Sequence, residues 1–213
     1  MPEVPRRAIL EGGEASLTID RSRFLGYALP IRSAADLEAG LGRVRALHPQ
    51  ATHWCFAGRI GPGQERQSDD GEPQGTAGLP LLETLRRRGI DFGLLCVVRY
   101  YGGRKLGRPG LYRAYLGAGA AALDGAQLGK VVPGALYELE APHQERVPIE
   151  RAVRDAGGAV VEEAFEERVR IAFWLPQEWT PDRLATRAPG AARARRVAEQ
   201  TRDVPDEEGG GPA

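Results

Sequence analysis

Two glycine-rich segments hold most of the residues in this chain that could do chemistry. The first reads S-D-D-G-E-P-Q-G-T-A-G from Ser68 to Gly78, and the second reads R-Y-Y-G-G-R-K-L-G-R-P-G-L-Y-R-A-Y from Arg99 to Tyr115. Glycine loses more conformational freedom on folding than any other residue, so this concentration predicts positive φ angles or close backbone contacts. We expect one or the other at seven positions: Gly71, Gly75, Gly78, Gly102, Gly103, Gly107 and Gly110.

The first segment is acidic. Asp69, Asp70 and Glu72 place three carboxylates within four residues, where they could bind a divalent cation or pair with basic groups. Asp and Ser also close turns and cap helices, and this structural role is the commoner one. A magnesium ion usually needs a phosphate ligand as well, so we predict neither a bound metal nor a cofactor. The candidate residues of this acidic segment are Ser68, Asp69, Asp70, Glu72, Gly75 and Thr76.

The second segment is basic and leads into a helix. Backbone N–H groups, a helix N-terminus and long cationic side chains together favour phosphate binding. Tyrosines alternate with the cations, a combination that can stack on bases while holding a nucleic-acid backbone. With equal weight, the arginines could instead pair with the carboxylates of the acidic segment in a structural network. The candidate anion- or RNA-binding residues are Arg99, Tyr101, Gly102, Gly103, Arg104, Lys105, Gly107, Arg108 and Arg113.

Known catalytic motifs are absent from the sequence. The basic segment lacks the G-K-[ST] ending of a P-loop and the G-x-G-x-x-G dinucleotide fingerprint, and neither G-x-S-x-G nor H-E-x-x-H occurs. His53 and Cys55 could face one side of a strand as metal ligands, but a buried, hydrogen-bonded histidine is favoured. Cys55 and Cys96 are expected to be reduced core thiols. We predict no catalytic residue and favour a non-enzymatic role.

The elements that must position these segments follow from hydrophobic periodicity and turn residues. The apolar run at 92–101 predicts a strand that is buried on both faces. In the first part of the chain we expect further strands at 15–19, 23–30 and 52–60 and helices at 34–47, 79–88 and 111–123. After a linker at 125–134, we expect strands at 135–141, 160–164, 168–175 and 195–200 and helices at 147–156 and 181–186.

This order predicts an α+β protein of two domains, at 1–131 and 132–204, followed by a disordered acidic tail at 205–213. The net charge of zero divides into +5 for residues 1–130 and −5 for residues 131–213, so an anionic partner would meet the first domain. No apolar stretch suits a signal peptide or a membrane span, and we expect a soluble, cytoplasmic protein.

The two glycine-rich segments resemble the signature of the YigZ/IMPACT family (uncharacterised protein family 29, Impact N-terminal domain). The stretch A-T-H-W-C at 51–55 and S-R-F at 22–24 also fit this family. The resemblance implies a first domain similar to domain 2 of a ribosomal protein, and a ferredoxin-like second domain similar to the last domain of elongation factor G. One departure is Arg108-Pro109, where relatives usually carry Thr-Gly; we expect Pro109 in the first turn of the following helix.

Eukaryotic members of the family regulate translation through a protein partner in the amino-acid-starvation pathway. The resemblance and the basic segment together lead us to expect a translation-associated regulatory factor that binds RNA or a ribosomal or translation-factor surface. Two alternatives stay open. The protein could be an enzyme that acts with magnesium on a phosphorylated small molecule or nucleotide, or a protein-interaction module in stress regulation.

Overall fold

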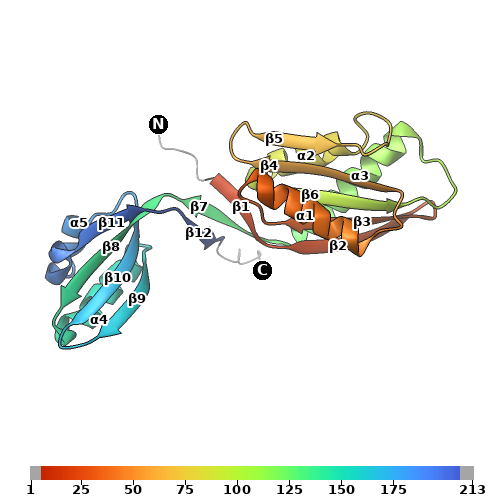
Figure 1. Cartoon of the computed structure of the whole chain (residues 1–213). Helices are drawn as coiled ribbons and strands as arrows, with labels where there is room; N and C mark the ends of the chain where they lie inside the picture. Colours follow the sequence, from red (N-terminus) through yellow and green to blue (C-terminus); the bar gives the residue numbers. More distant parts are fainter. Residues whose placement is uncertain (1–5, 207–213) are drawn as a thin grey trace, which may run out of the picture. The chain divides into compact units, whose positions relative to one another are not determined.

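The computed structural model describes residues 6–206, which form two compact units of mixed α+β structure (Figure 1). The first unit comprises the chain up to Lys130 together with residues from Pro205 onward, and the second is Val131–Val204. The predicted α+β class is confirmed. None of the helices within the described residues has the length and apolar character needed to cross a membrane.

The first unit is built on one mixed sheet, of which two strands, β7 and β12, also include residues of Val131–Val204. Its strands are β1 (Arg6–Glu11), β2 (Gly13–Ile19), β3 (Ser22–Leu29), β4 (His53–Ile60), β5 (Glu65–Ser68), β6 (Ile90–Tyr100), β7 (Gln127–Val132) and β12 (Arg202–Pro205). They run in the order β12-β7-β1-β6-β3-β2, with β4 also paired to β6 and β5 paired to β4. β6 is therefore central: it pairs in parallel with β1 and antiparallel with β3 and β4.

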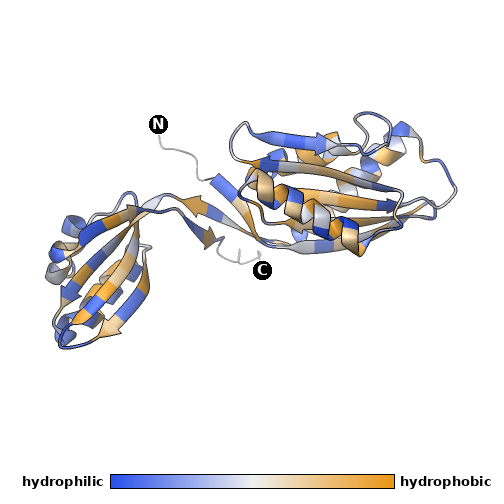
Figure 2. Ribbon diagram, in the orientation of Figure 1, coloured by the Kyte–Doolittle hydropathy of each residue, from blue (hydrophilic) through white to orange (hydrophobic). Residues whose placement is uncertain are grey.

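Helices cover both faces of this sheet. Leu94, Cys96 and Val98 of β6 lie in a core with α1 (Ala34–Leu47). Leu95 and Val97 lie in a second core with α2 (Gly78–Arg87) and α3 (Gly107–Asp124). The prediction that this strand is buried on both faces is confirmed, and Figure 2 shows the contrast between apolar β6 and hydrophilic β5.

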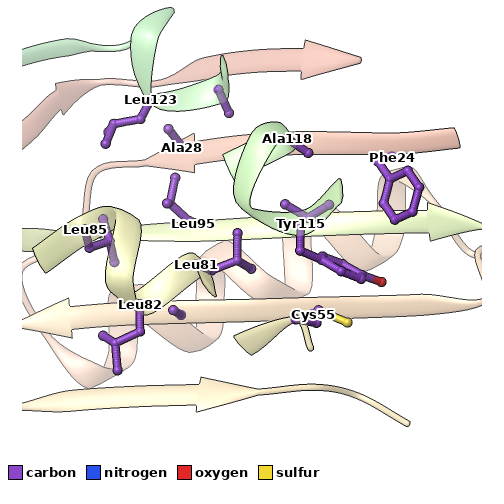
Figure 3. Packing of buried hydrophobic residues seen from close by; sticks show 14 of the residues in the cluster. Phe24, Ala28, Cys55, Leu81, Leu82, Leu85, Leu95, Tyr115, Ala118 and Leu123 are labelled. Atoms are coloured by element: carbon purple, nitrogen blue, oxygen red, sulfur yellow. The ribbon is translucent and has the colours of Figure 1, made fainter. Parts of the chain in front are cut away.

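Small side chains let α3 approach the sheet closely. Figure 3 shows Tyr115 and Ala118 of α3 in the core together with Leu81 of α2 and Leu95 of β6. A Cβ atom on Gly26 of β3 would lie 2.4 Å from the Ala118 carbonyl oxygen, so no larger residue fits there. The end of the basic segment forms the start of α3, so this close packing also fixes that part of the segment against the sheet.

The cysteines and one histidine are held within the sheet and its covering layer. Cys55 and Cys96 are buried free thiols, as predicted, and burial raises the pKa of Cys96 to about 12.

His48, at the C-terminal end of α1, lies between two tyrosine hydroxyl groups. The Tyr27 hydroxyl is 2.5 Å from its Nε2, and the Tyr100 hydroxyl is 3.0 Å from its Nδ1. Burial, with a contribution from Arg23, lowers the pKa of this imidazole.

The second unit contains a four-stranded antiparallel sheet in the order β11-β8-β10-β9. Every second residue of its strands, such as Tyr137 and Phe173, lies in one core with Ile149 and Val153 of the helix at His143–Asp155. The elements are β8 (Gly134–Ala141), α4 (His143–Asp155), β9 (Ala159–Phe165), β10 (Val169–Pro176), α5 (Pro181–Ala185), a 3₁₀ turn (Pro189–Arg193) and β11 (Arg195–Glu199). α4 begins one turn earlier than the sequence pattern predicts.

Four strands of the first unit escaped the sequence prediction. They are β1, β5, β7 and β12, of which β7 lies inside the predicted linker. β1, β7 and β12 are short and pair with strands that are distant in sequence, so their local pattern carries little signal. β5 forms a hairpin with β4, but its four residues Glu65–Ser68 are all polar and lack the apolar alternation of a strand. The predicted disordered tail starts at Pro205, but Pro205 ends β12, and the Asp206 N–H donates to the Leu128 carbonyl at 3.0 Å. The remainder of that tail, 207–213, lies outside the described residues.

Candidate functional site

The two glycine-rich segments lie against each other and enclose a pocket of about 510 Å³. The acidic segment runs from the end of β5 to the start of α2, and the basic segment runs from the end of β6 to the start of α3. Glu72 and Pro73 line the pocket from the acidic side, and Thr52 and His53 line it from the start of β4. The lining residues from the basic side are Arg99, Tyr101, Lys105, Leu106, Gly107, Arg108 and Leu111.

Asp69 acts as a cap for α2. Its Oδ1 accepts hydrogen bonds from the N–H groups of Ala77 and Gly78, each at 2.9 Å, and its Oδ2 accepts from the Gly75 N–H at 2.8 Å. The residue directly before α2 provides no side-chain cap. A carboxylate from eight residues upstream therefore satisfies the free donors of this helix, which also favour its negative charge.

Asp70 is held in a strained turn. Its φ is +43°, its Oδ2 accepts from the Trp54 N–H at 2.7 Å, and its own N–H donates to Ser68 Oγ at 3.1 Å. Thr76 closes the same segment by donating to the Pro73 carbonyl at 2.6 Å. For Asp69 and Asp70 the structure has the turn-and-cap arrangement rather than an open pair of carboxylates.

Glu72 and Arg99 form a buried ion pair that joins the two segments. Arg99 Nη1 donates to Glu72 Oε1 at 2.6 Å, with the side chains only 6% and 4% exposed. Tyr115 donates its hydroxyl to the same oxygen at 2.8 Å. Burial raises the pKa of this phenol, which keeps the donated proton on Tyr115. The predicted pairing of basic and acidic segments thus occurs at Arg99 and Glu72.

The guanidinium of Arg99 also stacks between two rings. Its Cζ lies 5.4 Å from the ring centroid of Phe24 and 5.2 Å from that of Tyr101, and its Nη2 donates to Ser22 Oγ at 3.3 Å. The Nε of Arg99 is buried without a hydrogen-bond partner among the described residues. Tyr101 is 46% exposed. The stack fixes Tyr101 as an aromatic platform beside the pocket.

His53 faces Glu72 inside the pocket. Its Nδ1 lies 2.7 Å from the Asp70 carbonyl oxygen, and its Nε2 lies 4.0 Å from Glu72 Oε1. The side chain is 20% exposed, so the interpretation as a hydrogen-bonded, mostly buried histidine holds. The sequence reasoning did not place His53, Thr52, Pro73, Leu106 or Leu111 in the site. Its one available signal was the A-T-H-W-C stretch at 51–55.

Two of the basic candidates border the pocket as cations. Lys105 is exposed and forms no ion pair or hydrogen bond with the described residues, while Arg108 Nη2 donates to the Gln74 carbonyl at 2.7 Å. Arg104 instead pairs with Asp20 at 3.5 Å, and Arg113 is exposed along α3; neither lines the pocket. α3 begins at Gly107, four residues before the predicted start at 111. Pro109 is its third residue and lies in the first turn, as expected.

The seven glycines behave as expected. Gly71, Gly75, Gly103 and Gly107 have positive φ angles, and at Gly78, Gly102 and Gly110 a Cβ atom would meet neighbours at 3.0 Å or less. The tightest is Gly102, where a Cβ would lie 2.1 Å from the Arg21 backbone. The Gly102 N–H also donates to Ser22 Oγ at 3.2 Å, which ties the basic segment to the β2–β3 turn.

Among residues 6–206, no group of three or more His, Cys, Asp or Glu side chains is arranged to hold a metal ion. The Oγ1 of Thr52 accepts from the Tyr101 N–H at 3.1 Å. The polar groups that can still contact a ligand are the Lys105 ammonium, the hydroxyl proton of Thr52, His53 Nε2 and the N-terminus of α3, which has no side-chain cap. They suit a ligand that carries a negative charge and a flat apolar body.

Several known proteins are similar to this chain in sequence. The family described as the Impact N-terminal domain matches residues 20–123. An IMPACT family member in the pol 5′ region of Thermus thermophilus is 42% identical over 74% of this chain and 86% of its own length. The members YvyE of Bacillus subtilis and YigZ of Escherichia coli are 31% and 34% identical over 81% and 74% of this chain, covering 80% and 79% of their own lengths.

A crystal structure of a hypothetical protein also superimposes with a TM-score of 0.61 at 28% identity, covering 96% of this chain and 100% of the other. The agreement extends over both units, beyond the residues that the family description matches. These matches confirm the resemblance read from the two glycine-rich segments. The chain therefore belongs to the IMPACT family, with the Impact N-terminal domain at residues 20–123.

Proposed function

We propose that the protein is a cytoplasmic, translation-associated regulatory factor that binds single-stranded RNA at the pocket between its glycine-rich segments. One observation carries the proposal: exposed Tyr101, stacked on buried Arg99, lines the same pocket as Lys105, a cation with no ion-pair partner among residues 6–206. An aromatic platform next to a cation is the arrangement that stacks a base and holds the adjoining phosphate.

The distribution of charge supports a nucleic-acid partner. Residues 1–130 carry a net charge of +5, although the whole chain is neutral. The carboxylates nearest the pocket do not oppose an incoming phosphate as free charges, because Asp69 is bound by three N–H groups and Glu72 by Arg99. RNA binding at this site releases counterions and should weaken as salt increases.

The magnesium-dependent enzyme is the weaker alternative. It needs the acidic segment to offer open carboxylate oxygens, but Asp69 and Asp70 accept hydrogen bonds from backbone N–H groups instead. The protein-interaction alternative stays a prediction, as do the likenesses to a ribosomal-protein domain and to the last domain of elongation factor G.

Fluorescence anisotropy with labelled single-stranded and duplex RNA at about 100 mM salt tests the proposal. We expect single-stranded RNA to bind more tightly than roughly 10⁻⁴ M, the level typical of non-specific binding. The chain offers a matched control, since its two lysines are Lys105 and Lys130, both exposed. Lys105→Glu should weaken binding about tenfold or more, and Lys130→Glu, with the same net charge, should weaken it less. Equal effects of the two variants would show that RNA does not bind at the pocket.

The affinity of a Tyr101→Ala variant for single-stranded RNA provides a second, independent test of the proposed binding mode. Loss of a stacking platform costs about 1–3 kcal/mol per base by alanine substitution, which is roughly a five- to 150-fold loss of affinity. Because this ring is half exposed, its removal should leave the folded state intact. Unchanged affinity for single-stranded RNA in a folded Tyr101→Ala protein would refute the proposed mode of binding.

A further inference from the structure

The inner wall of the pocket offers hydrogen-bond acceptors. A carbonyl oxygen can only accept, so the 2.7 Å contact between His53 Nδ1 and the Asp70 carbonyl requires the proton on Nδ1. In the neutral imidazole, Nε2 is then an acceptor. The neighbouring Glu72 carboxylate accepts hydrogen bonds from Arg99 and Tyr115 at its Oε1. With His53 in its neutral form, two acceptors therefore face each other.

The backbone around the pocket enforces this tautomer. Asp70 has a φ of +43° and is fixed by the hydrogen bonds of its carboxylate to Trp54 and of its N–H to Ser68. Its carbonyl is consequently directed at His53 by a strained turn that costs free energy to maintain. Strain that persists at a pocket is a reason to look for a role in binding.

The gap between the two acceptors calls for a donor. His53 Nε2 and Glu72 Oε1 are 4.0 Å apart, which is too far for a direct hydrogen bond and close enough for one donor atom to contact both. The pocket is also lined by the apolar side chains of Pro73, Leu106 and Leu111 and by the exposed cation of Lys105. A fitting ligand thus presents an N–H group to His53 and Glu72, a flat apolar body to the apolar side chains and a negative charge to Lys105.

We infer that the pocket binds one nucleotide whose base carries an exocyclic amino group (adenine, cytosine or guanine, but not uracil), with that group donating to His53 Nε2 and Glu72. The inference rests on the proposed function in taking the pocket as the RNA site. It adds a base preference that neither the Lys105 cation nor the tyrosine platform provides, since phosphate contacts and stacking are largely indifferent to the base. The His53 tautomer supplies the selectivity.

Isothermal titration calorimetry on the full chain tests the preference with two mononucleotides. Adenosine 5′-monophosphate (AMP) and purine riboside 5′-monophosphate differ only in the 6-amino group, so both keep the phosphate and the stacking face. We expect AMP to bind about tenfold more tightly or better, because buried acceptors left without a donor are costly. Equal affinity, or no detectable binding of either nucleotide, would overturn the inference.

A variant of His53 separates recognition from folding. The side-chain N–H of Asn can replace Nδ1–H toward the Asp70 carbonyl, while nothing replaces Nε2, so His53→Asn removes the acceptor and keeps the turn. In a variant with an unchanged melting temperature, AMP should bind as weakly as purine riboside 5′-monophosphate binds to the natural protein. Retained discrimination would refute the role of His53.

If the variant is less stable, the two nucleotides on the natural protein still decide the question. The outcomes also distinguish this inference from the proposed function. RNA that binds at the pocket together with equal affinity for the two mononucleotides would leave the proposed function standing without the base preference. Selective AMP binding with no RNA binding would instead identify a small-molecule site.

Discussion

The Glu72–Arg99 pair should dominate the stability of the first unit, and Glu72→Gln is the cleanest way to measure it. The substitution keeps the shape of the side chain and removes its charge. Because both side chains are at least 94% buried, solvent screens little of the interaction, and Arg99 is left as an uncompensated buried cation. Loss of one partner of a buried ion pair typically costs about 3–5 kcal/mol. That is a large share of the roughly 5–15 kcal/mol that stabilises a natural domain.

The control is the same substitution in an exposed pair of the same unit. Glu38 and Arg66 lie 2.7 Å apart with side chains 56% and 49% exposed, and such surface pairs contribute about 0.2–1 kcal/mol. Hydrogen exchange measured by mass spectrometry at increasing urea should be read from peptides of β4 and β6. Peptides of β8 and β10 then report the second unit as an internal reference, because a two-unit chain need not unfold in one step.

A free energy loss for Glu72→Gln no larger than that for Glu38→Gln would refute this reasoning. The double variant Glu72→Gln/Arg99→Met sharpens the test. Replacing both charged partners by uncharged residues removes the buried cation and should recover part of the loss. No recovery would mean that the pair matters through its hydrogen bonds to neighbours rather than through its charge.

Three further predictions concern capping, backbone contact and pH. Asp69→Ala leaves three backbone N–H groups without their acceptor and should lower the free energy of unfolding by about 2 kcal/mol or more, measured by urea denaturation. Gly102→Ala should lower the melting temperature strongly because of its 2.1 Å backbone clash, whereas Gly42→Ala, in open space on α1, should gain about 0.5–1 kcal/mol. Burial and the nearby Arg23 lower the pKa of His48, so the folded state binds fewer protons than the unfolded chain. The free energy of unfolding should therefore fall as pH drops below about 6.5. In thermal denaturation at a series of pH values, His48→Gln should reduce this dependence on pH.

The sequence predicted best what local chemistry decides. The bounds of α1 are those expected, because its apolar stripe is regular and Ser33 accepts from the Asp36 N–H at the N-terminus. The burial of β6 on both faces followed from its unbroken apolar run. Short strands such as β1 and β7 were missed because each is stabilised by its neighbours in the sheet.

Within the site, residue types were easier to predict than their partners. The sequence indicated pairing between the arginines of the basic segment and the acidic segment, yet only the fold selects Arg99 and Glu72 from the several possible pairs. The division between Lys105, at the pocket, and Arg104, paired with Asp20, depends on where α3 begins. The role of His53 depends on a carbonyl direction set by a single strained turn, which no residue pattern encodes.

The late position of β12 in the chain has a consequence for synthesis. β12 pairs with β7, and Asp206 pairs with Arg7, but β12 and Asp206 both come after β8, β9, β10 and β11 in the sequence. A ribosome therefore releases the whole four-stranded sheet of the second unit before the edge beside β7 can be covered. Until then β7 presents unpaired backbone groups of the kind that invite intermolecular strand pairing. Nascent chains stalled within the second unit should consequently be more prone to aggregation than the finished protein.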